Sequence, residues 1–436
     1  MKRKLILSVA AGAILATAGM SYGAGFRINE QGAKAMGMAN AFTAQADDPS
    51  ALYFNPAGIS FLKGAQVNLG SLLIAVPETE FSGLTPLSNG ATVQEKAKRD
   101  LFVAPTVYAT YSFENLPLTL GLGINSIYPL AKSWDASSNF RNQVTNISIK
   151  PINFQPTVSY RFDDLNLAVA AGVDVTYAQV SLQNAIYTPS LAGPAEFGDL
   201  GVDGTATDVG FNLGVLWKPR KDLSFGAAYR SKITLHISGD ANFIATQPTG
   251  YALVQSIAPA PFTPGRFTSP ASTTITLPQS ANLGVAWKPI EKLTLELDAE
   301  WTGWSCFDKL QINFNSAQFS ALNNNPIPKN WKDAWAYKFG AQYAATPIVD
   351  LRAGYAYDTS PVPDSTLGAE LPDSDRHNVS VGIGLHNSFG AIDLAYMWVH
   401  FIDRTVNNMD LATLRGENGT FKSDAHLFGA NVTIKF

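Results

Sequence analysis

The side chains that most often perform enzymatic chemistry are few and scattered in this chain of 436 residues. The histidines are His236, His377, His386, His400 and His426. None of them stands at a metal-ligand spacing, and we expect them to line a lumen or an interface. Outside residues 1–23, no Gly-x-Ser-x-Gly segment places a nucleophilic serine on a sharp turn, and the single cysteine, Cys306, allows no internal disulfide. We therefore expect no enzymatic activity, no metal site and no cofactor.

The composition excludes several classes of protein. Charged residues make up 15% of the chain, against about 25% in soluble proteins. The net charge of −4 offers no basic surface for nucleic acid. The mean hydropathy of +0.02 is too low for a bundle of membrane helices. Together with 11% aromatic residues, these values favour strands that are apolar on alternate residues only.

Several segments alternate apolar and polar residues with a period of two, which is the pattern of a strand with one apolar face. They include 223–238, 351–358 and 379–386. In the segment LTLELDAEWT, one face carries Leu293, Leu295, Leu297, Ala299 and Trp301. The opposite face carries Thr294, Glu296, Asp298 and Glu300. Such a strand either buries its apolar face against another sheet or turns it towards lipid.

Strand length separates these two alternatives. Soluble strands average about five or six residues, whereas a tilted strand in a membrane barrel needs about nine to eleven. Several alternating segments here exceed ten residues. Tryptophans near the predicted strand ends fit the aromatic girdles of a membrane protein, and these are Trp217, Trp287, Trp301 and Trp304. We therefore predict a transmembrane β-barrel.

The connections between the predicted strands are alternately short and long, as in outer-membrane barrels. The six short connections are FENLP, RFDDL, WKPRKD, WKPIEK, ATPIVD and HNSFG. The seven long ones fall near 84–97, 131–147, 185–206, 239–272, 308–334, 360–374 and 403–422. The sequence therefore predicts an all-β fold, with a barrel of fourteen antiparallel strands over residues 65–436.

The two ends of the chain indicate export to the outer membrane of a Gram-negative bacterium. Residues 1–23 have the charged and apolar regions of a secretory signal peptide, with cleavage expected before Ala24. The chain ends on an alternating strand whose last residue, Phe436, resembles the assembly signal of bacterial outer-membrane barrels. We expect the barrel-assembly machinery to recognise Phe436, and the folded protein to act as a monomer in the bilayer.

Residues 24–64 lack strand alternation and are rich in small and turn-forming residues. They include DDPSALYFNPAG, where two prolines interrupt any strand and Asn55-Pro56 indicates a turn. The interior of a fourteen-stranded barrel is wider than side chains alone can fill. We expect this segment to fold into the lumen as a plug, or hatch.

These features together resemble the FadL/TodX family of outer-membrane transporters for hydrophobic compounds. The resemblance covers essentially the whole mature chain and rests on AGFRINEQG, ALYFNPAG, YPLAKSW, YRS, YDTSPVPD, PDSDR and the final phenylalanine. It implies capture of a hydrophobic ligand at external loops, transfer to a pocket inside the barrel, movement of the hatch, and lateral exit through the wall. Lateral exit avoids returning an apolar molecule to water. The resemblance also implies that detergent or lipid occupies the lumen.

Matched residue by residue, the resemblance places Phe26 near the inner pocket and the kink of the third strand at Pro129. Proline removes a hydrogen-bond donor from a sheet, so a lateral gap is compatible with this residue. Hatch or gating roles fall on Asn55, Pro56, Ala57 and Asp358. Asp358 lies on the predicted inward face of its strand, where it either anchors the hatch or is a solvated charge.

The resemblance indicates long-chain fatty acids as the cargo, but one departure leaves room for others. Family members that carry fatty acids hold the carboxylate with basic residues. The first of these positions is Asn184 here, and the second is Lys329 or Lys332. A charge-assisted hydrogen bond contributes about 1.5–3 kcal/mol, so the asparagine weakens the case for a fatty acid. Uncharged aromatic hydrocarbons or alkanes are the alternative cargo, and a nonspecific porin is a further alternative that the long amino-terminal segment disfavours.

Overall fold

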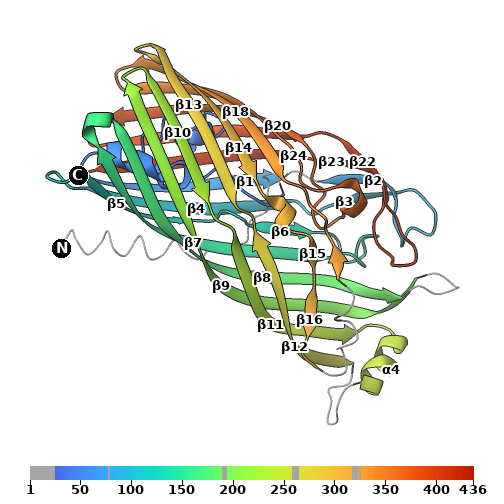
Figure 1. Ribbon diagram of the computed structural model, residues 1–436. Coiled ribbons are helices and arrows are strands. Elements are labelled where there is room, and N and C mark those ends of the chain that lie inside the picture. The colour runs from blue at the N-terminus through green and yellow to red at the C-terminus, as the bar shows by residue number, and fades with distance from the viewer. Residues whose placement is uncertain (1–24, 77–78, 189–193, 258–264, 317–322, 324–325) are drawn as a thin grey trace, which may run out of the picture.

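The computed structural model describes residues 25–436, apart from 77–78, 189–193, 258–264, 317–322 and 324–325. The predicted signal peptide lies outside the described residues. Fourteen antiparallel strands close into a barrel, as the alternation and the connections predicted (Figure 1). The first and last strands close the ring along a ladder that runs from Gln66–Lys435 to Ala75–His426.

Ten of the barrel strands are continuous and four are interrupted. The continuous strands are β1 (Ala65–Val76), β4 (Asp100–Ser112), β7 (Asn146–Phe162), β8 (Leu167–Thr188), β9 (Ala195–Arg220), β18 (Ala334–Thr346), β19 (Val349–Asp358), β20 (Arg376–Asn387), β21 (Gly390–Phe401) and β24 (Asp424–Lys435). The interrupted strands consist of β5 (Leu118–Asn125) with β6 (Leu130–Ser133), β10 (Leu223–Arg230) with β11 (Ile233–Ala245), β12 (Arg266–Leu277) with β13 (Ser280–Ile290), and β14 (Leu293–Thr302) with β16 (Ile312–Phe314). The interruptions matter because they are places where the wall lacks continuous hydrogen bonding.

The barrel has a short-turn end and a long-loop end. All six predicted short connections join neighbouring strands at the short-turn end, where the carboxyl terminus also lies (Figure 1). One of them contains the 3₁₀ turn η2 (Asp163–Leu165). The long connections all lie at the opposite end.

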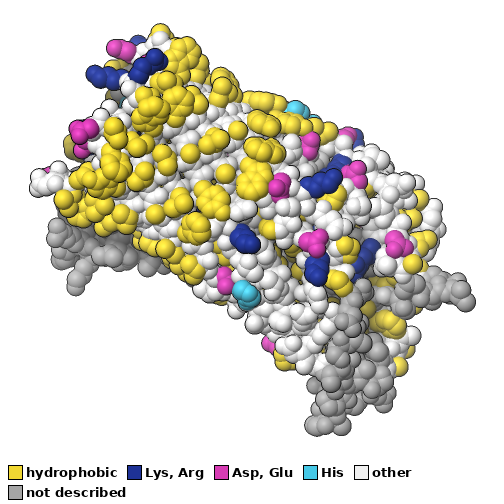
Figure 2. Space-filling model, viewed as in Figure 1, with side chains coloured by type: hydrophobic (Ala, Val, Ile, Leu, Met, Phe, Trp, Pro, Cys, Tyr) yellow, Lys and Arg dark blue, Asp and Glu magenta, His cyan; other side chains and the backbone are white. Residues whose placement is uncertain are grey.

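Side chains alternate between the lumen and the outer surface, and the outer surface is apolar. In β14, Leu297 is 62% exposed, whereas its neighbours Glu296 and Asp298 are 0% and 5% exposed. Figure 2 shows hydrophobic side chains over the wall towards the short-turn end, while charged side chains gather at the rim and towards the long-loop end. A band of this kind suits contact with lipid acyl chains.

Strands β8, β9, β11 and β12 continue far beyond this band, so the long connections predicted at 185–206 and 239–272 are wrong. The described residues of the first belong mostly to β8 and β9, and the second contracts to residues 246–265, which hold α4 (Pro248–Ile257). In this part of the wall the apolar side chains face the lumen and the polar side chains face outwards, the reverse of the lipid-facing band. Ile237 and Phe243 are buried inside, whereas His236 points outwards. The wall has left the lipid there, so its outer face is polar although the period of two persists.

The remaining elements cover the long-loop end. A small sheet consists of β22 (Arg404–Asn407), β23 (Asn418–Lys422), β2 (Glu80–Leu84) and β3 (Val93–Lys96). A short ladder joins β15 (Lys309–Leu310) to β17 (Ile327–Pro328), and two 3₁₀ turns are η3 (Trp304–Cys306) and η5 (Asp364–Thr366). Rings of Phe81, Phe140 and Phe421 pack under the small sheet, with centroids 4.8–6.0 Å apart. This apolar packing joins the small sheet to the connection that carries Phe140.

The amino-terminal segment from Gly25 to Leu62 lies inside the barrel, and nearly all of its residues are buried. It contains only α2 (Ala33–Met36), α3 (Ala51–Phe54) and the 3₁₀ helix η1 (Pro56–Phe61). In the described part of the chain, no helix is long and apolar enough to cross a membrane. The segment therefore combines short helical turns of its own with hydrogen bonds to the barrel wall.

Glycines on the inner wall let the amino-terminal segment approach the strands closely. A Cβ atom on Gly226 of β10 would lie 2.0 Å from the carbonyl oxygen of Thr43, and one on Gly354 of β19 would lie 2.2 Å from the carbonyl carbon of Met38. Both distances are far below van der Waals contact, so the strand positions require glycine. The other inner-wall glycines with close contacts to the segment are Gly121, Gly214, Gly284, Gly340, Gly382 and Gly429.

We expect Gly226→Leu to displace the amino-terminal segment and open the lumen. The new side chain would need the space that the backbone at Thr43 occupies. Single-channel conductance in planar bilayers should rise several-fold above that of the unmodified protein. The matched control is Ala227→Leu, which places the same leucine side chain on the outer face and should leave conductance unchanged. Equal conductance in the two variants would contradict this packing.

Candidate functional site

The barrel wall is open between β4 and β6. The ladder between β4 and β5 ends at the pair Val107–Ile124. Residues 126–129 then leave the sheet, and β6 pairs with β7 instead. Among the described residues no ladder joins β6 to residues 100–106 of β4. Pro129, where the kink was expected, is buried and is the last residue of the displaced stretch.

The displaced stretch is hydrogen-bonded to the amino-terminal segment. The Ile28 amide donates to the carbonyl oxygen of Ile127 at 2.8 Å, and the Gln31 side-chain amide donates to the carbonyl oxygen of Ser126 at 2.8 Å. Tyr108 of β4 donates its hydroxyl to the carbonyl oxygen of Gln31 at 2.9 Å. The gap and the segment are therefore mechanically connected, because movement of residues 28–31 would release residues 126–127.

The gap is apolar on both faces of the wall. Inside, Phe102 and Ala104 of β4 and Ala131 of β6 are buried in one cluster. The cluster also contains Ile28, Met36, Leu72, Ile74, Met397, Val399, Phe401 and Leu427. Outside, Leu101 and Val103 of β4 are exposed by 62% and 36%. An apolar molecule would therefore meet mainly apolar side chains on its way from the lumen to lipid, with Lys132 and Asp373 lining the cavity beside Ala131.

Phe26 lies at the centre of a buried aromatic cluster in the lumen. Its ring centroid lies 4.7 Å from Trp304, 5.9 Å from Trp331, 6.2 Å from Phe307 and 6.4 Å from Tyr128. All four pairs are edge-to-face, a geometry that aromatic rings favour. The structure thus places Phe26 deep in the lumen, in a site that its own phenyl ring fills.

Trp304 is not part of an interfacial girdle, so that prediction is wrong. It is fully buried in the turn η3, where the chain leaves the wall between β14 and β16. The alternation ends one residue earlier, at Gly303, and the chain then turns inwards. Trp217 and Trp287 are exposed by 46% and 47%, as expected for outer residues.

The interruption between β5 and β6 is connected across the lumen to the interruption between β12 and β13. The Tyr128 hydroxyl, from the displaced stretch after β5, donates to the carbonyl oxygen of Pro278 at 2.9 Å. Pro278 lies in the break between β12 and β13, beside the strand that carries η3. The aromatic cluster therefore forms a layer between the open gap and the opposite wall.

Three inward carboxylates of β14 hold the amino-terminal segment. Asp298 accepts from the backbone amides of residues 42 and 43 at 2.9 and 3.0 Å. Glu296 accepts from the amides of residues 44 and 45 at 2.6 and 3.0 Å. Glu300 forms an ion pair with Arg27. The period of two places these three carboxylates on one face of the strand, but no function was predicted for them. Three acidic residues that face a lumen could have indicated a contact with the amino-terminal segment.

The predicted hatch turn packs against β9. The Asn55 side-chain amide donates to the carbonyl oxygens of Thr43 at 2.8 Å and Val215 at 2.9 Å. Its oxygen accepts from the Ala57 amide at 3.2 Å, and Pro56 begins η1. Asn55 therefore ties the turn both to the rest of the segment and to the wall.

Asp358 faces the lumen as predicted but bonds to the wall. It accepts from the Arg376 guanidinium at 2.9 Å and from the Asn378 side-chain amide at 2.9 Å, both on β20. The carboxylates that bond to the amino-terminal segment are instead those of β14 and that of Asp373, which accepts from the Gly25 amide. Asp358 thus contributes to the inner lining beside the segment.

The structure does not bring the predicted carboxylate-binding residues into one basic site. The Asn184 side-chain amide points inwards from β8 and donates to the carbonyl oxygen of Asn142 at 3.2 Å. Lys329 is 7% exposed and forms an ion pair with Glu370. Lys332 is exposed, and its backbone amide donates to the carbonyl oxygen of Pro361 at 2.8 Å.

Two carboxylates in the loops above the lumen differ in their protonation. Burial would raise the pKa of Glu370, but Lys329 outweighs this effect and the pKa of Glu370 is lowered. Burial, followed by the nearby charge of Glu370, raises the pKa of Glu417 to about 8. Gln143 donates to Glu417 at 3.3 Å. Near neutral pH the loops above the lumen therefore hold one ion pair, Lys329–Glu370, and one largely protonated acid, Glu417.

A narrow apolar cleft opens between the long strands at the long-loop end. Its lining comes from β7, β8, β9, β11, β12, β15 and β16, and its free volume is about 50 Å³. The apolar lining residues are Ile147, Ile149, Val180, Leu182, Val202, Ile237, Ile275, Leu310 and Ile312. This cleft is where an apolar molecule arriving from outside would first be shielded from water.

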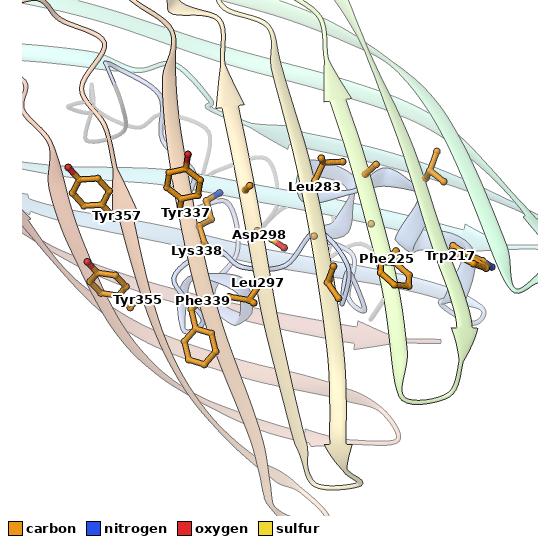
Figure 3. Close-up of a pocket in the computed structure, with 16 residues that line it drawn as sticks. Trp217, Phe225, Leu283, Leu297, Asp298, Tyr337, Lys338, Phe339, Tyr355 and Tyr357 are labelled. Atoms are coloured by element: carbon orange, nitrogen blue, oxygen red, sulfur yellow. The ribbon is translucent and has the colours of Figure 1, made fainter.

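A larger hollow of about 790 Å³ lies on the outer wall (Figure 3). Outward side chains of β9, β10, β13, β14, β18 and β19 line it, including Trp217, Phe225, Leu283, Phe339 and Tyr355. The hollow faces the surroundings of the barrel, and acyl chains of the membrane would cover such a surface. It is separate from the lumen, because the strands behind it form continuous ladders.

Comparison with known proteins identifies relatives over the full length. A family model described as outer membrane protein transport protein (OMPP1/FadL/TodX) matches residues 14–436. The long-chain fatty acid transport protein of Escherichia coli O6:H1 is 24% identical over 448 residues, which cover 95% of this chain and 95% of that protein.

Solved structures share the fold. A FadL homologue from Pseudomonas aeruginosa superposes with a TM-score of 0.83 at 22% identity, over 95% of this chain and all of that chain. The toluene transporter TodX from Pseudomonas putida superposes with a TM-score of 0.68 at 17% identity, over 95% of this chain and 99% of that chain. The described barrel therefore has the architecture of these two structures.

We expect the connection at 403–422, which contains Glu417, to become less stable as the pH rises. The pKa of Glu417 is raised from 4.5 to about 8. Its contribution to stability is therefore fully present below about pH 4.5 and is lost as the pH rises through about 8. Amide hydrogen exchange of this loop, corrected for intrinsic rates, should be faster at pH 9 than at pH 6.

Glu417→Gln should remove this difference, because glutamine imitates the protonated acid. The matched control is Asp410→Asn in the same loop, where hydrogen bonds with Thr413 and Ala412 lower the pKa of Asp410. That carboxylate stays ionised from pH 6 to pH 9, so the control should keep the wild-type pH dependence. A pH dependence that survives in Glu417→Gln would contradict the assignment.

Proposed function

Because this chain belongs to the OMPP1/FadL/TodX family of outer membrane transport proteins, we propose that it carries hydrophobic compounds across the outer membrane, with long-chain fatty acids as the first candidates. The observation that carries the proposal is the apolar gap between β4 and β6, which is bonded to the amino-terminal segment. A relative over 95% of the chain is named a long-chain fatty acid transport protein.

The proposed path has three parts. The cargo enters the apolar cleft among the long strands, passes to the aromatic cluster around Phe26, and leaves through the gap beside Ala104 and Ala131. Each part is lined by apolar side chains, so the cargo avoids transfer back into water. Lateral exit delivers it to lipid without crossing a polar pore.

We propose that residues 24–64 act as the hatch. Their described part fills the lumen, and carboxylates of β14 hold it. Exit through the gap requires residues 28–31 to release residues 126–127, which a local shift of the segment would achieve. Asn55, Pro56 and Ala57 form a turn of the segment. The Asn55 side chain anchors this turn to β9. The same occupation of the lumen disfavours a nonspecific porin.

Uncharged aromatic hydrocarbons or alkanes are the second candidate cargo. The observation that favours them is the state of the two expected basic positions: Asn184 carries no charge, and Lys329 is already paired with Glu370. A fatty acid would have to displace Glu370 to gain that lysine. The TodX structure, which shares the fold, is named a toluene transporter.

We further propose that the protein works as a monomer, because one chain supplies both the closed wall and the lumen filling. Detergent or lipid would occupy the remaining free space. Phe436 at the end of β24 is 79% exposed at the short-turn end, where the barrel-assembly machinery could bind it.

Closing the gap should block uptake and spare binding. Cysteines in place of Ala104 and Ala131, joined by a disulfide or a short bifunctional thiol reagent in a Cys306→Ser background, would tie β4 to β6. Uptake of labelled oleate by whole cells should fall at least tenfold, while binding to the purified protein stays unchanged. Reduction of the cross-link should restore uptake.

The matched control joins Val107→Cys to Ile124→Cys, two positions that already face each other in the β4–β5 ladder. This cross-link adds a bond where the wall is closed and should leave uptake at the wild-type level. Continued uptake with the gap tied shut would refute the lateral route.

A ligand pair separates the two candidate cargoes. In Glu370→Gln, Lys329 loses its partner, so oleate should bind about ten- to a hundredfold more tightly, as expected for one charge-assisted hydrogen bond. Methyl oleate, which has no charge, should change by less than about twofold. Calorimetric titration in detergent measures both. An equal change for the two ligands would show that the carboxylate never reaches Lys329 and would favour uncharged cargo.

A further inference from the structure

Two buried tryptophans beside Phe26 have hydrogen-bond donors without acceptors. Among the described residues, neither the Trp304 indole nitrogen nor the Trp331 indole nitrogen has a hydrogen-bond partner. Trp304 is 0% exposed and Trp331 is 6% exposed. Buried indole N–H groups usually find an acceptor, and a buried donor left without one is costly. Two such donors in one cluster require an explanation.

Other tryptophans of the chain are different. The Trp134 indole donates to the carbonyl oxygen of Ala369 at 3.0 Å, and the indoles of Trp301 and Trp398 donate to aspartates at 3.2 and 3.1 Å. The two unsatisfied indoles are close neighbours, with ring centroids 4.9 Å apart. Among the buried tryptophans of the described residues, the missing acceptors are thus confined to the site that Phe26 fills.

The amino-terminal segment covers these indoles. A Cβ atom on Gly25 would lie 2.8 Å from Cε2 of Trp304, the ring carbon bonded to the indole nitrogen, and 2.8 Å from Cζ3 of Trp331. Gly25 has φ +68°, a conformation that glycine adopts without strain. Phe26 follows and packs edge-on against both indoles. The phenyl ring therefore takes the place that an aromatic or alkyl group of a ligand would take.

We infer that this cluster is a ligand site for apolar molecules that carry an uncharged hydrogen-bond acceptor, such as a ketone, ester or ether oxygen. When the segment moves, the apolar part of the ligand replaces the Phe26 ring and its oxygen accepts from the indoles of Trp304 and Trp331. This inference rests on the proposed transport of hydrophobic cargo, and it specifies which hydrophobic compounds are preferred.

The surroundings favour an uncharged acceptor over an anion. Asp373 accepts from the Gly25 amide at 3.2 Å, so a carboxylate stands at the edge of the cluster. Arg27, the next residue after Phe26, is paired with Glu300. An anionic head group would meet the Asp373 charge without gaining a free cation, whereas a neutral oxygen needs only the two donors.

A matched ligand pair tests the inference. Decylbenzene and 1-phenyldecan-1-one have nearly the same shape, and only the ketone has an acceptor oxygen. In Trp304→Phe/Trp331→Phe, which keeps aromatic rings but removes both donors, affinity for the ketone should fall about 10- to 30-fold, as expected for two hydrogen bonds. Affinity for decylbenzene should stay within about twofold. Calorimetric titration of the full-length protein in detergent gives both values.

Two further variants keep the test decisive. Trp335→Phe, on the outer face, should leave both affinities unchanged. Phe26→Ala removes the ring that fills the site, so both ligands should bind several-fold more tightly; weaker binding would contradict the role of Phe26 as an occupant. The single variants Trp304→Phe and Trp331→Phe serve if the double variant does not fold, each with a three- to tenfold loss for the ketone.

The outcomes separate this inference from the proposed function. An unchanged ketone-to-hydrocarbon ratio in the tryptophan variants would overturn the inference and leave hydrophobic transport intact. Failure of the unmodified protein to bind either ligand would overturn the inference, and the proposed function would fall with it if oleate also failed to bind.

Discussion

Every backbone amide of the amino-terminal segment must find an acceptor inside a lumen that excludes most water, and this constraint shapes the rest of the molecule. The segment has only a few helical turns, so the wall supplies acceptors for the amides that these turns leave over. Glu296 and Asp298 receive four consecutive amides, and inner-wall glycines such as Gly226 let the backbone come close enough. At the gap the segment again donates, because the Ile28 amide and the Gln31 side chain donate to the carbonyl oxygens of residues 127 and 126 of the wall.

This mutual bonding connects structure to transport. A barrel that gave the segment no polar partners would expel it and become an open pore, and one that held it equally everywhere would keep it fixed. Here Glu296 and Asp298 of β14 hold residues 42–45 of the segment, and Glu300 holds Arg27, whereas the Phe26 ring packs through aromatic contacts. The aromatic contacts of this ring can be replaced by an apolar ligand while the Arg27–Glu300 pair stays intact. The segment is therefore anchored at Arg27 and at its centre, and the Phe26 ring is its replaceable part.

The period-two alternation was sufficient to predict the strand number, the short turns and the inward carboxylates of β14, because these follow from local chemistry. It failed where the environment changes along a strand: residues 239–245 continue β11 beyond the lipid, with apolar side chains inside and polar ones outside. It also failed at Trp304, whose burial depends on an interruption of the wall. The pairing of Lys329 with Glu370 joins residues far apart in the sequence, and no local pattern indicates it.

The central claim is that an apolar ligand releases the beginning of the amino-terminal segment from the wall gap. Hydrogen exchange of the protein in proteoliposomes, followed by mass spectrometry with and without oleate or decylbenzene, tests it directly. The account predicts faster exchange in peptides that contain residues 25–32 and 126–129 when ligand is present, with no change in the β1–β24 ladder. Ligand binding that leaves exchange in both peptides unchanged would contradict it.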